Sequence, residues 1–333
     1  MHRWLVLLGG IVVAGCSGNQ SMFNPQGPPA RSIANLGWML IALSIGIWIA
    51  VMAVLAVALF RRRQESDQSP ATTRRLTRHV TVASAATVVV LVALSVMTFV
   101  ADRGLNSPSG RGAITVDVIG HQWWWEFQYR GDSPDRFVTS PNELHIPVGV
   151  PVVLRATSRD VIHSFWVPNL HGKRDLIPGM VTSTWIQADR PGVYRGQCAE
   201  FCGHQHARMA FLVVAEPAER FQAWIDGQRR PATEPAVDAS GDELRRGRDV
   251  FLQGPCVTCH TIRGTEAGAR LGPELTHIAS RMTLAAGTLP NTRDHLARWI
   301  VNAQAVKPGS RMPPIALGAT ELEPLLAYLR SLQ

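Results

Sequence analysis

The sequence has few cysteines, and they show no pattern of disulfide pairing. The cysteines among its 333 residues are Cys16, Cys198, Cys202, Cys256 and Cys259. Their number is odd and four of them form two close pairs beside histidines, so a disulfide framework is not indicated. The chain also lacks a dense basic stripe, although its formal net charge is +8. This lack excludes a nucleic-acid-binding surface.

The excess positive charge lies largely in a short arginine-rich segment and in a mildly basic C-terminal domain, residues 241–333, with 11 basic and 8 acidic side chains. Residues 101–230 are nearly balanced, with 14 basic and 13 acidic side chains. Six arginines instead lie between two long apolar runs, which indicates a loop beside a membrane. These arginines are Arg61, Arg62, Arg63, Arg74, Arg75 and Arg78.

The N-terminus has the pattern of an export signal. His2 and Arg3 precede an apolar run from Trp4 to Ala14 that is too short to span a membrane. We predict that residues 1–15 are a lipoprotein-type signal peptide and that Cys16 is the lipid-modified N-terminus. The alternative is an ordinary signal peptide with an incidental cysteine. In both cases the following segment, residues 16–35, is exported.

Two charge-free apolar runs predict a transmembrane hairpin. Leu36–Phe60 and Val80–Val100 are each long enough for a hydrocarbon core of ~30 Å. The arginine-rich loop between them, residues 61–79, is predicted to be cytoplasmic by the positive-inside rule. The hairpin therefore covers residues 36–100, and everything after it lies outside the membrane.

The remaining chain divides into two domains with different residue patterns. Short β-rich runs separated by Gly and Pro turns predict a β-sandwich or barrel over residues 101–229. Residues 230–241 are rich in Pro and Ala without an apolar period, which indicates a linker. Helical spacing of apolar residues follows in residues 242–333 and predicts an all-α domain.

A cluster of soft donor atoms lies near the end of the predicted sandwich. Cys198, Cys202, His206 and Met209 fall within twelve residues, and sulfur with imidazole selects copper over hard cations. Two cysteines at this spacing indicate two bridged metals rather than a single blue-copper ion. His163 is the predicted second imidazole. A disulfide between Cys198 and Cys202 or a zinc site are the alternatives, but neither explains His163 and Met209.

The helical domain carries the attachment motif of a c-type haem, Cys256-Val-Thr-Cys259-His260. Both thiols attach the haem, and His260 is presented to the iron. The segment Leu271–Leu275 resembles the loop that supports the proximal histidine in class I cytochromes c. Met312, which resembles the methionine of that family's Met-Pro loop, is the predicted sixth ligand. Met282 is predicted to be a core residue instead.

Four motifs together resemble subunit II of haem-copper cytochrome c oxidases, fused here to a C-terminal class I cytochrome c. The resemblance covers Leu36 to about Ala215 and includes the hairpin. It implies a multidomain membrane protein with a transmembrane hairpin, a cupredoxin-like Greek-key sandwich and an all-α cytochrome c domain. The motifs are Gly120–Phe127, Asp160–Pro168, Lys173–Gly179 and Gly196–Met209.

The resemblance also implies roles for individual residues. The thiolates of Cys198 and Cys202 bridge two coppers in a copper A centre. The Glu200 carboxylate matches a magnesium ligand at the interface with the catalytic subunit, and Trp123 matches the aromatic residue through which electrons enter. Trp124 and Trp125 are predicted to belong to the core. The other copper ligands implied are His163, His206, Met209 and the backbone carbonyl of Glu200.

We expect a proton-translocating terminal oxidase subunit in a bacterial plasma membrane, with its copper and haem domains outside. Electrons would pass from a cytochrome c or a quinol–cytochrome c reductase complex to the haem, the copper pair and then catalytic subunit I, with subunit III as a further partner. Oxygen is reduced in subunit I, because this chain has no membrane-embedded histidine set for haem and copper. A stand-alone membrane-tethered electron carrier or copper sensor is the alternative. A nitrous oxide reductase would need a large histidine-rich domain, and the chain has 11 histidines.

Overall fold

The computed structural model describes residues 18–60, 69–105, 113–131, 137–236 and 241–333. These divide into two compact units, one of residues 31–107 and the other of residues up to 30 together with residues 108–333. The predicted signal peptide, Cys16 and parts of the predicted cytoplasmic loop and linker lie outside the described residues.

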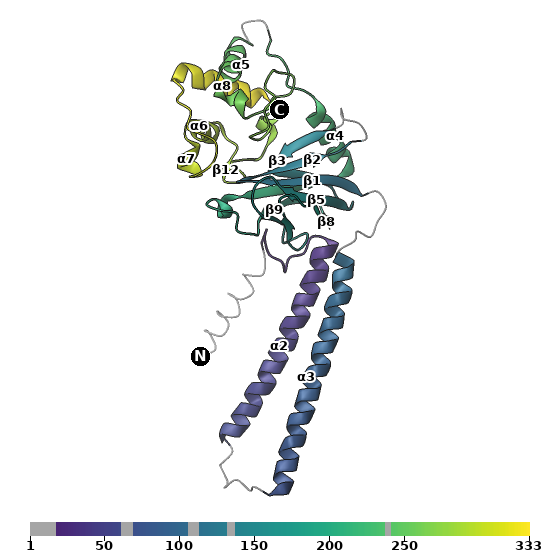
Figure 1. Ribbon diagram of the computed structural model, residues 1–333. Helices are drawn as coiled ribbons and strands as arrows, with labels where there is room; N and C mark the ends of the chain where they lie inside the picture. The colour runs from purple at the N-terminus through teal and green to yellow at the C-terminus, as the bar shows by residue number, and fades with distance from the viewer. Residues whose placement is uncertain (1–17, 61–68, 106–112, 132–136, 237–240) are drawn as a thin grey trace, which may run out of the picture. The chain divides into compact units, whose positions relative to one another are not determined.

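Two long helices form the smaller unit, α2 (Pro28–Phe60) and α3 (Pro70–Leu105) (Figure 1). Each contains an 18-residue window that is strongly apolar, with mean hydropathy 2.7 in α2 and 2.4 in α3, and neither window is buried. By length and composition both helices can cross a membrane. Both helices begin before the predicted runs, because proline at the first helical position presets the backbone. The Ser69 hydroxyl also accepts a hydrogen bond from Thr72 N at the start of α3.

Residues 113–131 and 137–216 form a sandwich of two five-stranded sheets. The first sheet has the order β3 (Val138–Pro141), β2 (Trp124–Tyr129), β1 (Ile114–His121), β5 (Val152–Ser158) and β8 (Thr182–Ile186). The second has the order β4 (Glu143–Pro147), β10 (Ala210–Glu216), β9 (Gly192–Cys198), β6 (His163–Trp166) and β7 (Arg174–Leu176). Within them, β1 pairs with β5 and β4 with β10 in parallel, and the other pairs are antiparallel. This is the predicted cupredoxin-like sandwich.

Alternation of side chains places the core between the sheets. In β5 every second residue from Val152 is buried, as expected for a strand with one face on a core. Aromatic rings dominate the interior, with Trp125, Phe165 and Phe211 in mutual contact. Trp125 is fully buried as predicted, whereas Trp124 is only partly buried and stacks on His121. The prediction that Trp124 belongs to the core is therefore wrong, because successive strand residues face opposite sides.

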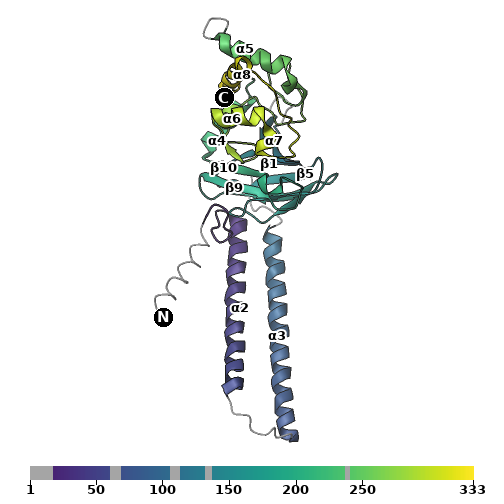
Figure 2. The same ribbon diagram turned by 90° about the vertical axis from the view of Figure 1, so that its left-hand side faces the viewer.

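The C-terminal domain is built from helices α5 (Asp242–Gln253), α6 (Arg293–Val301), α7 (Ala303–Val306) and α8 (Ala319–Ser331). Helices α5 and α8 cross closely at Gly247, where a Cβ would lie 1.9 Å from the carbonyl oxygen of Pro324. A short hairpin of β11 (Thr283–Leu284) and β12 (Leu289–Pro290) is added to this predicted all-α domain. Figures 1 and 2 show α7 on the sandwich side of the domain and α5 and α8 away from it.

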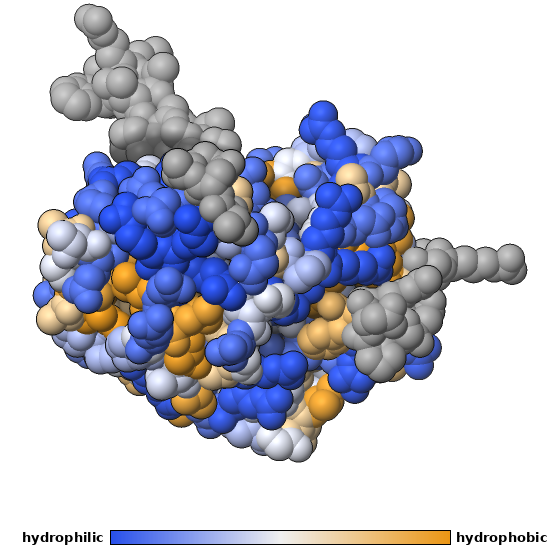
Figure 3. Space-filling view, turned by 90° about the horizontal axis from the view of Figure 1, so that it is seen from above, coloured by the Kyte–Doolittle hydropathy of each residue, from blue (hydrophilic) through white to orange (hydrophobic). Residues whose placement is uncertain are grey.

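Helix α4 (Ala218–Arg229) follows the sandwich directly and packs on β3 and β4. Its Phe221 and Ile225 are buried, and Trp224 stacks on His145 with 4.0 Å between ring centroids. Seen from above, hydrophobic residues interrupt the hydrophilic surface of the larger unit (Figure 3). The core of the C-terminal domain is separate from that of the sandwich and includes Phe251, Ile262, Leu296, Ile300 and Tyr328.

Candidate metal centre

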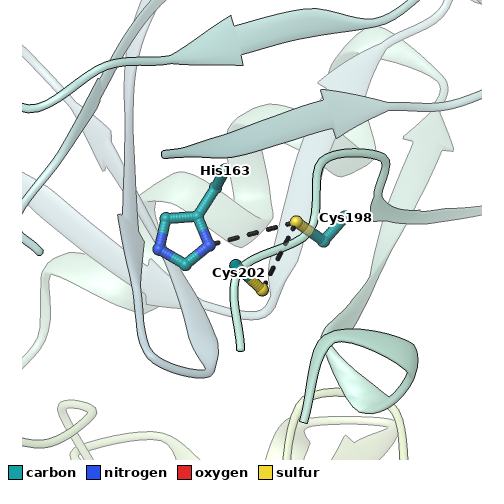
Figure 4. A group of neighbouring side chains, drawn as sticks. All are labelled: His163, Cys198 and Cys202. Carbon is teal, nitrogen blue, oxygen red and sulfur yellow. Dashed lines mark hydrogen bonds between the residues drawn. The ribbon is translucent and has the colours of Figure 1, made fainter. Parts of the chain in front are cut away.

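The two cysteines of the sandwich lie side by side at one end of the second sheet. Cys198 ends β9 and Cys202 lies in the loop that follows, with 3.7 Å between the two sulfurs (Figure 4). The imidazole of His163 faces the same point, with Nδ1 at 3.9 Å from Cys198 Sγ. Pairing of β6 with β9 brings it there, since Phe165 lies opposite Cys198. All three side chains are buried.

The remaining predicted copper ligands approach the sulfurs from the loop before β10. His206 Nδ1 lies 3.6 Å from Cys202 Sγ, and Met209 Sδ lies 3.8 Å from the same sulfur. The backbone carbonyl oxygen of Glu200 lies 3.1 Å from Cys198 Sγ. The structure therefore brings together the six residues that the sequence suggested as ligands.

The donor set fits copper better than the two alternatives. A disulfide requires about 2.05 Å between sulfurs, and the thiols of Cys198 and Cys202 are free. Structural zinc is held by four ligands in a closed tetrahedron, whereas here a thioether and a carbonyl accompany two thiols and two imidazoles. Soft sulfur and imidazole donors are those that copper prefers.

The surroundings of the Cys198 thiol favour its charged, thiolate form. The contact with Cys202 lowers the pKa of the Cys198 thiol, and the hydrogen bond with His163 acts in the same direction against burial. The pKa of Cys202 is raised by its contact with Cys198 and by burial. One thiolate therefore forms readily beside the imidazole, and metals bind thiolates rather than thiols.

Asp160 fixes the orientation of His163 and was not singled out from the sequence. Its Oδ1 lies 2.8 Å from His163 Nε2, so the Nδ1 atom is left facing the sulfurs. Burial raises the pKa of Asp160, but hydrogen bonds from His163 and from Gln122 N outweigh it and lower the pKa to about 2. A carboxylate on the outer nitrogen of a ligating imidazole is a common support of metal sites. Its sequence signals were its place at the start of the Asp160–Pro168 motif and its spacing of three residues from the histidine.

Trp123 lies directly against the ligand loop. Its indole Nε1 donates to the carbonyl oxygen of Cys202 at 2.9 Å, and Gln122 Nε2 donates to the same oxygen at 2.9 Å. The side chain is only partly buried. The predicted input residue is thus one hydrogen bond away from a predicted copper ligand.

The carboxylate of Glu200 points away from the sulfurs and is part of an exposed ion pair. Its Oε2 lies 3.0 Å from Lys173 Nζ, and the same ammonium lies 3.6 Å from Asp175. Two further histidines of the sandwich, His121 and His204, have other surroundings. His121 pairs with Glu126 at 3.0 Å, and His204 is exposed.

The predicted haem motif has the local geometry that attachment requires. Cys256 and Cys259 are free thiols in and after a short 3₁₀ turn, and both are partly buried. His260 Nδ1 lies 2.7 Å from the carbonyl oxygen of Pro273, which leaves Nε2 available. Burial lowers the pKa of His260, which favours the neutral, ligating imidazole. These residues fit a covalent haem.

Of the two candidate methionines, one is partly buried and one is exposed. Met312 packs against the core of the C-terminal domain, and its carbonyl oxygen accepts a hydrogen bond from Gln304 at 2.9 Å. Met282 is 49% exposed, so its prediction as a core residue is wrong. Its place before β11 explains this, since the backbone there binds Glu143 rather than entering the core.

Comparison with known proteins decides the family. Residues 132–216 match the family model "Cytochrome C oxidase subunit II, periplasmic domain", and residues 244–333 match "Cytochrome c". Cytochrome c oxidase subunit 2 of Alkalihalophilus pseudofirmus is 33% identical over 97% of this chain and 94% of its own length. The chain belongs to the cytochrome c oxidase subunit 2 family.

Other similar proteins align with smaller parts of the chain. Cytochrome c oxidase subunit 2 of Bacillus subtilis is 28% identical over 66% of this chain and 63% of its own length. Quinol oxidase subunit 2 of Bacillus cereus is 26% identical over 71% of this chain and 82% of its own length. The solved periplasmic domain of subunit II of cytochrome oxidase (CoxB) of Bradyrhizobium japonicum is 28% identical, with a TM-score of 0.34 over 37% of this chain and 96% of that chain.

Membership of the subunit 2 family has direct structural consequences. The chain is a membrane-anchored protein with an extracellular sandwich domain. The family implies copper A in the sandwich, haem c in the C-terminal domain and a catalytic subunit I as partner. The homologues are subunits of an oxidoreductase, cytochrome c oxidase.

Proposed function

We propose that this chain is the subunit through which electrons enter a terminal respiratory cytochrome c oxidase. The observation that carries the proposal is the convergence of six donor residues, from β6, β9 and the loop before β10, on one buried point. A quinol oxidase subunit without copper would not need this set. The related quinol oxidase subunit 2 sequences therefore do not decide the function.

In this proposal the residues of the sandwich hold two coppers in fixed positions. The thiolates of Cys198 and Cys202 would hold both coppers, with His163, His206, Met209 and the Glu200 carbonyl completing the set. Bound copper would supply one-electron transfer with little rearrangement, because two shared thiolates would spread the change in charge. The chain supplies the rest: Asp160 orients His163, and the aromatic core behind the site excludes water.

In the C-terminal domain, Cys256 and Cys259 would attach a haem covalently, and His260 and Met312 would hold its iron. Methionine with histidine raises the reduction potential of such a haem. Trp123 is the input side chain to the copper domain. Electrons would then pass from a donor through the haem and copper domains to subunit I, which would reduce oxygen to water with proton pumping.

The partners and location follow from the same proposal. The donor is a cytochrome c or a quinol–cytochrome c reductase complex, and subunit III is a further neighbour. The Glu200 carboxylate is proposed to exchange its ion pair with Lys173 for magnesium at the interface with subunit I. The protein is proposed to be a multi-pass component of a bacterial plasma membrane, with Cys16 lipidated and both redox domains on the outer side.

The test is purification of the tagged protein from its native membrane in mild detergent. We expect two coppers per chain, a c-type haem spectrum and a many-spanning partner that consumes oxygen when a reduced donor is added. A protein that carries copper and haem but co-purifies with no such partner would favour a stand-alone carrier or sensor. Absence of copper would refute the proposed site.

A further inference from the structure

A loop of the C-terminal domain covers the side of the copper domain where Trp123 lies. At Gly309, a Cβ would lie 3.7 Å from the His204 ring and 3.9 Å from the Trp123 ring. Its φ of +81° is a conformation that glycine adopts without strain. This covering loop, residues 306–312, ends at Met312. The predicted haem ligand is thus on the same short segment that contacts the input tryptophan.

Three side chains fasten the covering loop to the copper domain. Lys307 donates from Nζ to the carbonyl oxygen of Trp123 at 2.7 Å. In the opposite direction, Gln205 Nε2 donates to the Pro308 carbonyl at 2.6 Å, and Arg208 donates to the Val306 carbonyl at 2.6 Å. Gln205 and Arg208 flank the copper ligand His206. All three acceptors are backbone carbonyls, so the contact fixes backbone positions on both sides.

Lys307 also joins this contact to a second one. Its Nζ donates to the Ala285 carbonyl at 3.1 Å, in the turn of the β11–β12 hairpin. That hairpin region binds the sandwich through Ala286 O, which accepts from Ala210 N at 3.1 Å, and through Met282 N, which donates to Glu143 at 2.6 Å. One ammonium therefore connects the copper domain, the covering loop and the hairpin.

The burial of Lys307 shows how complete the contact is. The residue is only 3% exposed, although lysine is seldom buried. Burial lowers the pKa of its amine to about 7, with Arg208 acting in the same direction and Cys202 opposing it. A buried amine is costly unless its donors are satisfied. The Ala285 carbonyl lies in the same domain as Lys307, but the Trp123 carbonyl accepts from Nζ only while the two domains are in contact.

We infer that Lys307 is a positioning residue that holds the C-terminal domain on the Trp123 side of the copper domain. The contact keeps the two domains together in one arrangement before electron transfer, so they do not have to meet by diffusion. It also covers one side of Trp123, so the C-terminal domain stands where a separate cytochrome c would approach this side chain. The functional meaning of this contact rests on the function proposed above, whereas the contact itself does not.

The chain contains its own control for a direct test. Lysine occurs at only two positions, Lys173 and Lys307, and the side chain of Lys173 is 49% exposed. Because Lys173 lies beside Glu200 at the proposed subunit I interface, the full chain is first released from its partner subunits in detergent. It is then treated with an amine-acetylating reagent, and labelling of each lysine is followed by peptide mass spectrometry. We expect Lys307 to react roughly tenfold or more slowly than Lys173, because it must wait for the domains to open. Similar rates would overturn the inference.

Two variants then test the role of the contact. Gln205→Ala should accelerate acetylation of Lys307 and leave that of Lys173 unchanged. Lys307→Met keeps an unbranched side chain, one atom shorter than that of lysine, and removes the donors. It should preserve copper, iron and both spectra and slow reduction of copper after haem reduction by a light flash. Arg246→Met, an exposed change on α5, is the matched control and should match wild type in both measurements.

These outcomes separate the two proposals. Loss of copper or haem in the wild-type protein would refute the proposed function, whatever the lysines do. Rapid acetylation of Lys307 in a protein with full copper and haem would refute the contact alone. Unchanged flash kinetics in Lys307→Met, with both metals present, would refute its positioning role.

Discussion

Each predicted metal-binding histidine outside the ligand loop lies against a glycine. A Cβ on Gly120 would lie 2.7 Å from the His163 ring, and a Cβ on Gly272 would lie 2.7 Å from the His260 ring. Real Cβ atoms essentially never approach so closely, so either ring would have to move. The two imidazoles are thus held by the absence of a side chain on one side and by Asp160 or Pro273 on the other.

Gly120→Ala should therefore reduce copper binding while the haem stays intact. A mutation that disturbs the groups holding a ligating histidine in place typically lowers metal affinity roughly 10–100-fold. Copper and iron per chain are measured after dialysis against graded copper concentrations. Gly268→Ala is the control, because a Cβ there meets nothing within 4 Å. Equal copper affinity in the two variants would show that the Gly120 contact is unimportant.

The bridging role of the two thiols has its own test. Cys198→Ser or Cys202→Ser should abolish the electron paramagnetic resonance pattern of one electron shared by two coppers, because hydroxyl oxygen is a poor soft-metal bridge. The haem spectrum should remain, since Cys256 and Cys259 lie in the other domain. Persistence of the shared-electron pattern in either variant would contradict bridging.

At the scale of elements, β4 and α4 meet around a buried titratable cluster. His145 Nδ1 lies 3.0 Å from Glu216 on β10, Glu143 lies on its other side, and Trp224 of α4 stacks on the ring. Burial lowers the pKa of His145, but the hydrogen bonds with Glu143 and Glu216 outweigh it and raise the pKa above 6.5. The protonated histidine thus holds three elements together.

Because the folded-state pKa of His145 is raised, its stabilisation is fully present below pH 6.5 and disappears as pH rises through that folded-state value. Amide hydrogen exchange in β4 and α4, corrected for the intrinsic effect of pH, should reveal lower protection above this range. His145→Gln should flatten the pH dependence. A wild-type protection profile that is flat from about pH 6 to about pH 9, across and above the range in which histidine ordinarily titrates, would exclude this role.

The helices α2 and α3 carry the prediction about topology. Six arginines lie between the two apolar runs, and Lys and Arg are retained on the cytoplasmic side. A reporter fused after Arg63 should be active only in the cytoplasm, and one fused after Gly241 only outside. The opposite pattern would place both redox domains on the wrong side for the proposed donor.

For the whole molecule, the fused C-terminal domain takes the place of a separate cytochrome that would dock on the copper domain. The stretch of residues 101–230 has 14 basic and 13 acidic side chains, so it has no large acidic excess to attract a basic cytochrome. Tethering through a short linker gives an effective concentration that can reach about millimolar. The interdomain hydrogen bonds of Lys307, Gln205 and Arg208 to carbonyls do not depend on a complementary charged face.

Electron transfer from haem to copper should therefore depend only weakly on ionic strength. Most of any salt effect should appear in the reaction of the external donor with the haem, where screening acts over a Debye length of ~10 Å at 0.1 M. Flash-induced copper reduction at low and high salt measures the first step, and steady oxygen consumption measures both. Met312→Leu should slow turnover; unchanged turnover with the physiological donor would mean that the haem is not on the path.

Local spacing in the sequence was sufficient wherever the chemistry is local. The CxxCH motif predicted the haem-attachment site. The four-residue step from Cys198 to Cys202 predicted the pair of thiols, and the lengths of the apolar runs predicted the two long helices. The fold class and the family, predicted from the β-rich runs and the four family motifs, are confirmed. Such features depend on neighbours within a few residues, and the backbone geometry of a turn or helix determines their distances.

Only the tertiary structure decided the relations between distant residues. The register of β6 against β9 places His163 beside Cys198, and strand alternation separates buried Trp125 from partly exposed Trp124. Contact between the two domains binds the Met282 backbone to Glu143 and leaves the Met282 side chain exposed, and the same contact buries Lys307. None of these follows from composition or spacing, because burial depends on which surfaces meet when the sheets and domains pack. The sequence by itself determined the donor atoms, and packing decided which of them face one another.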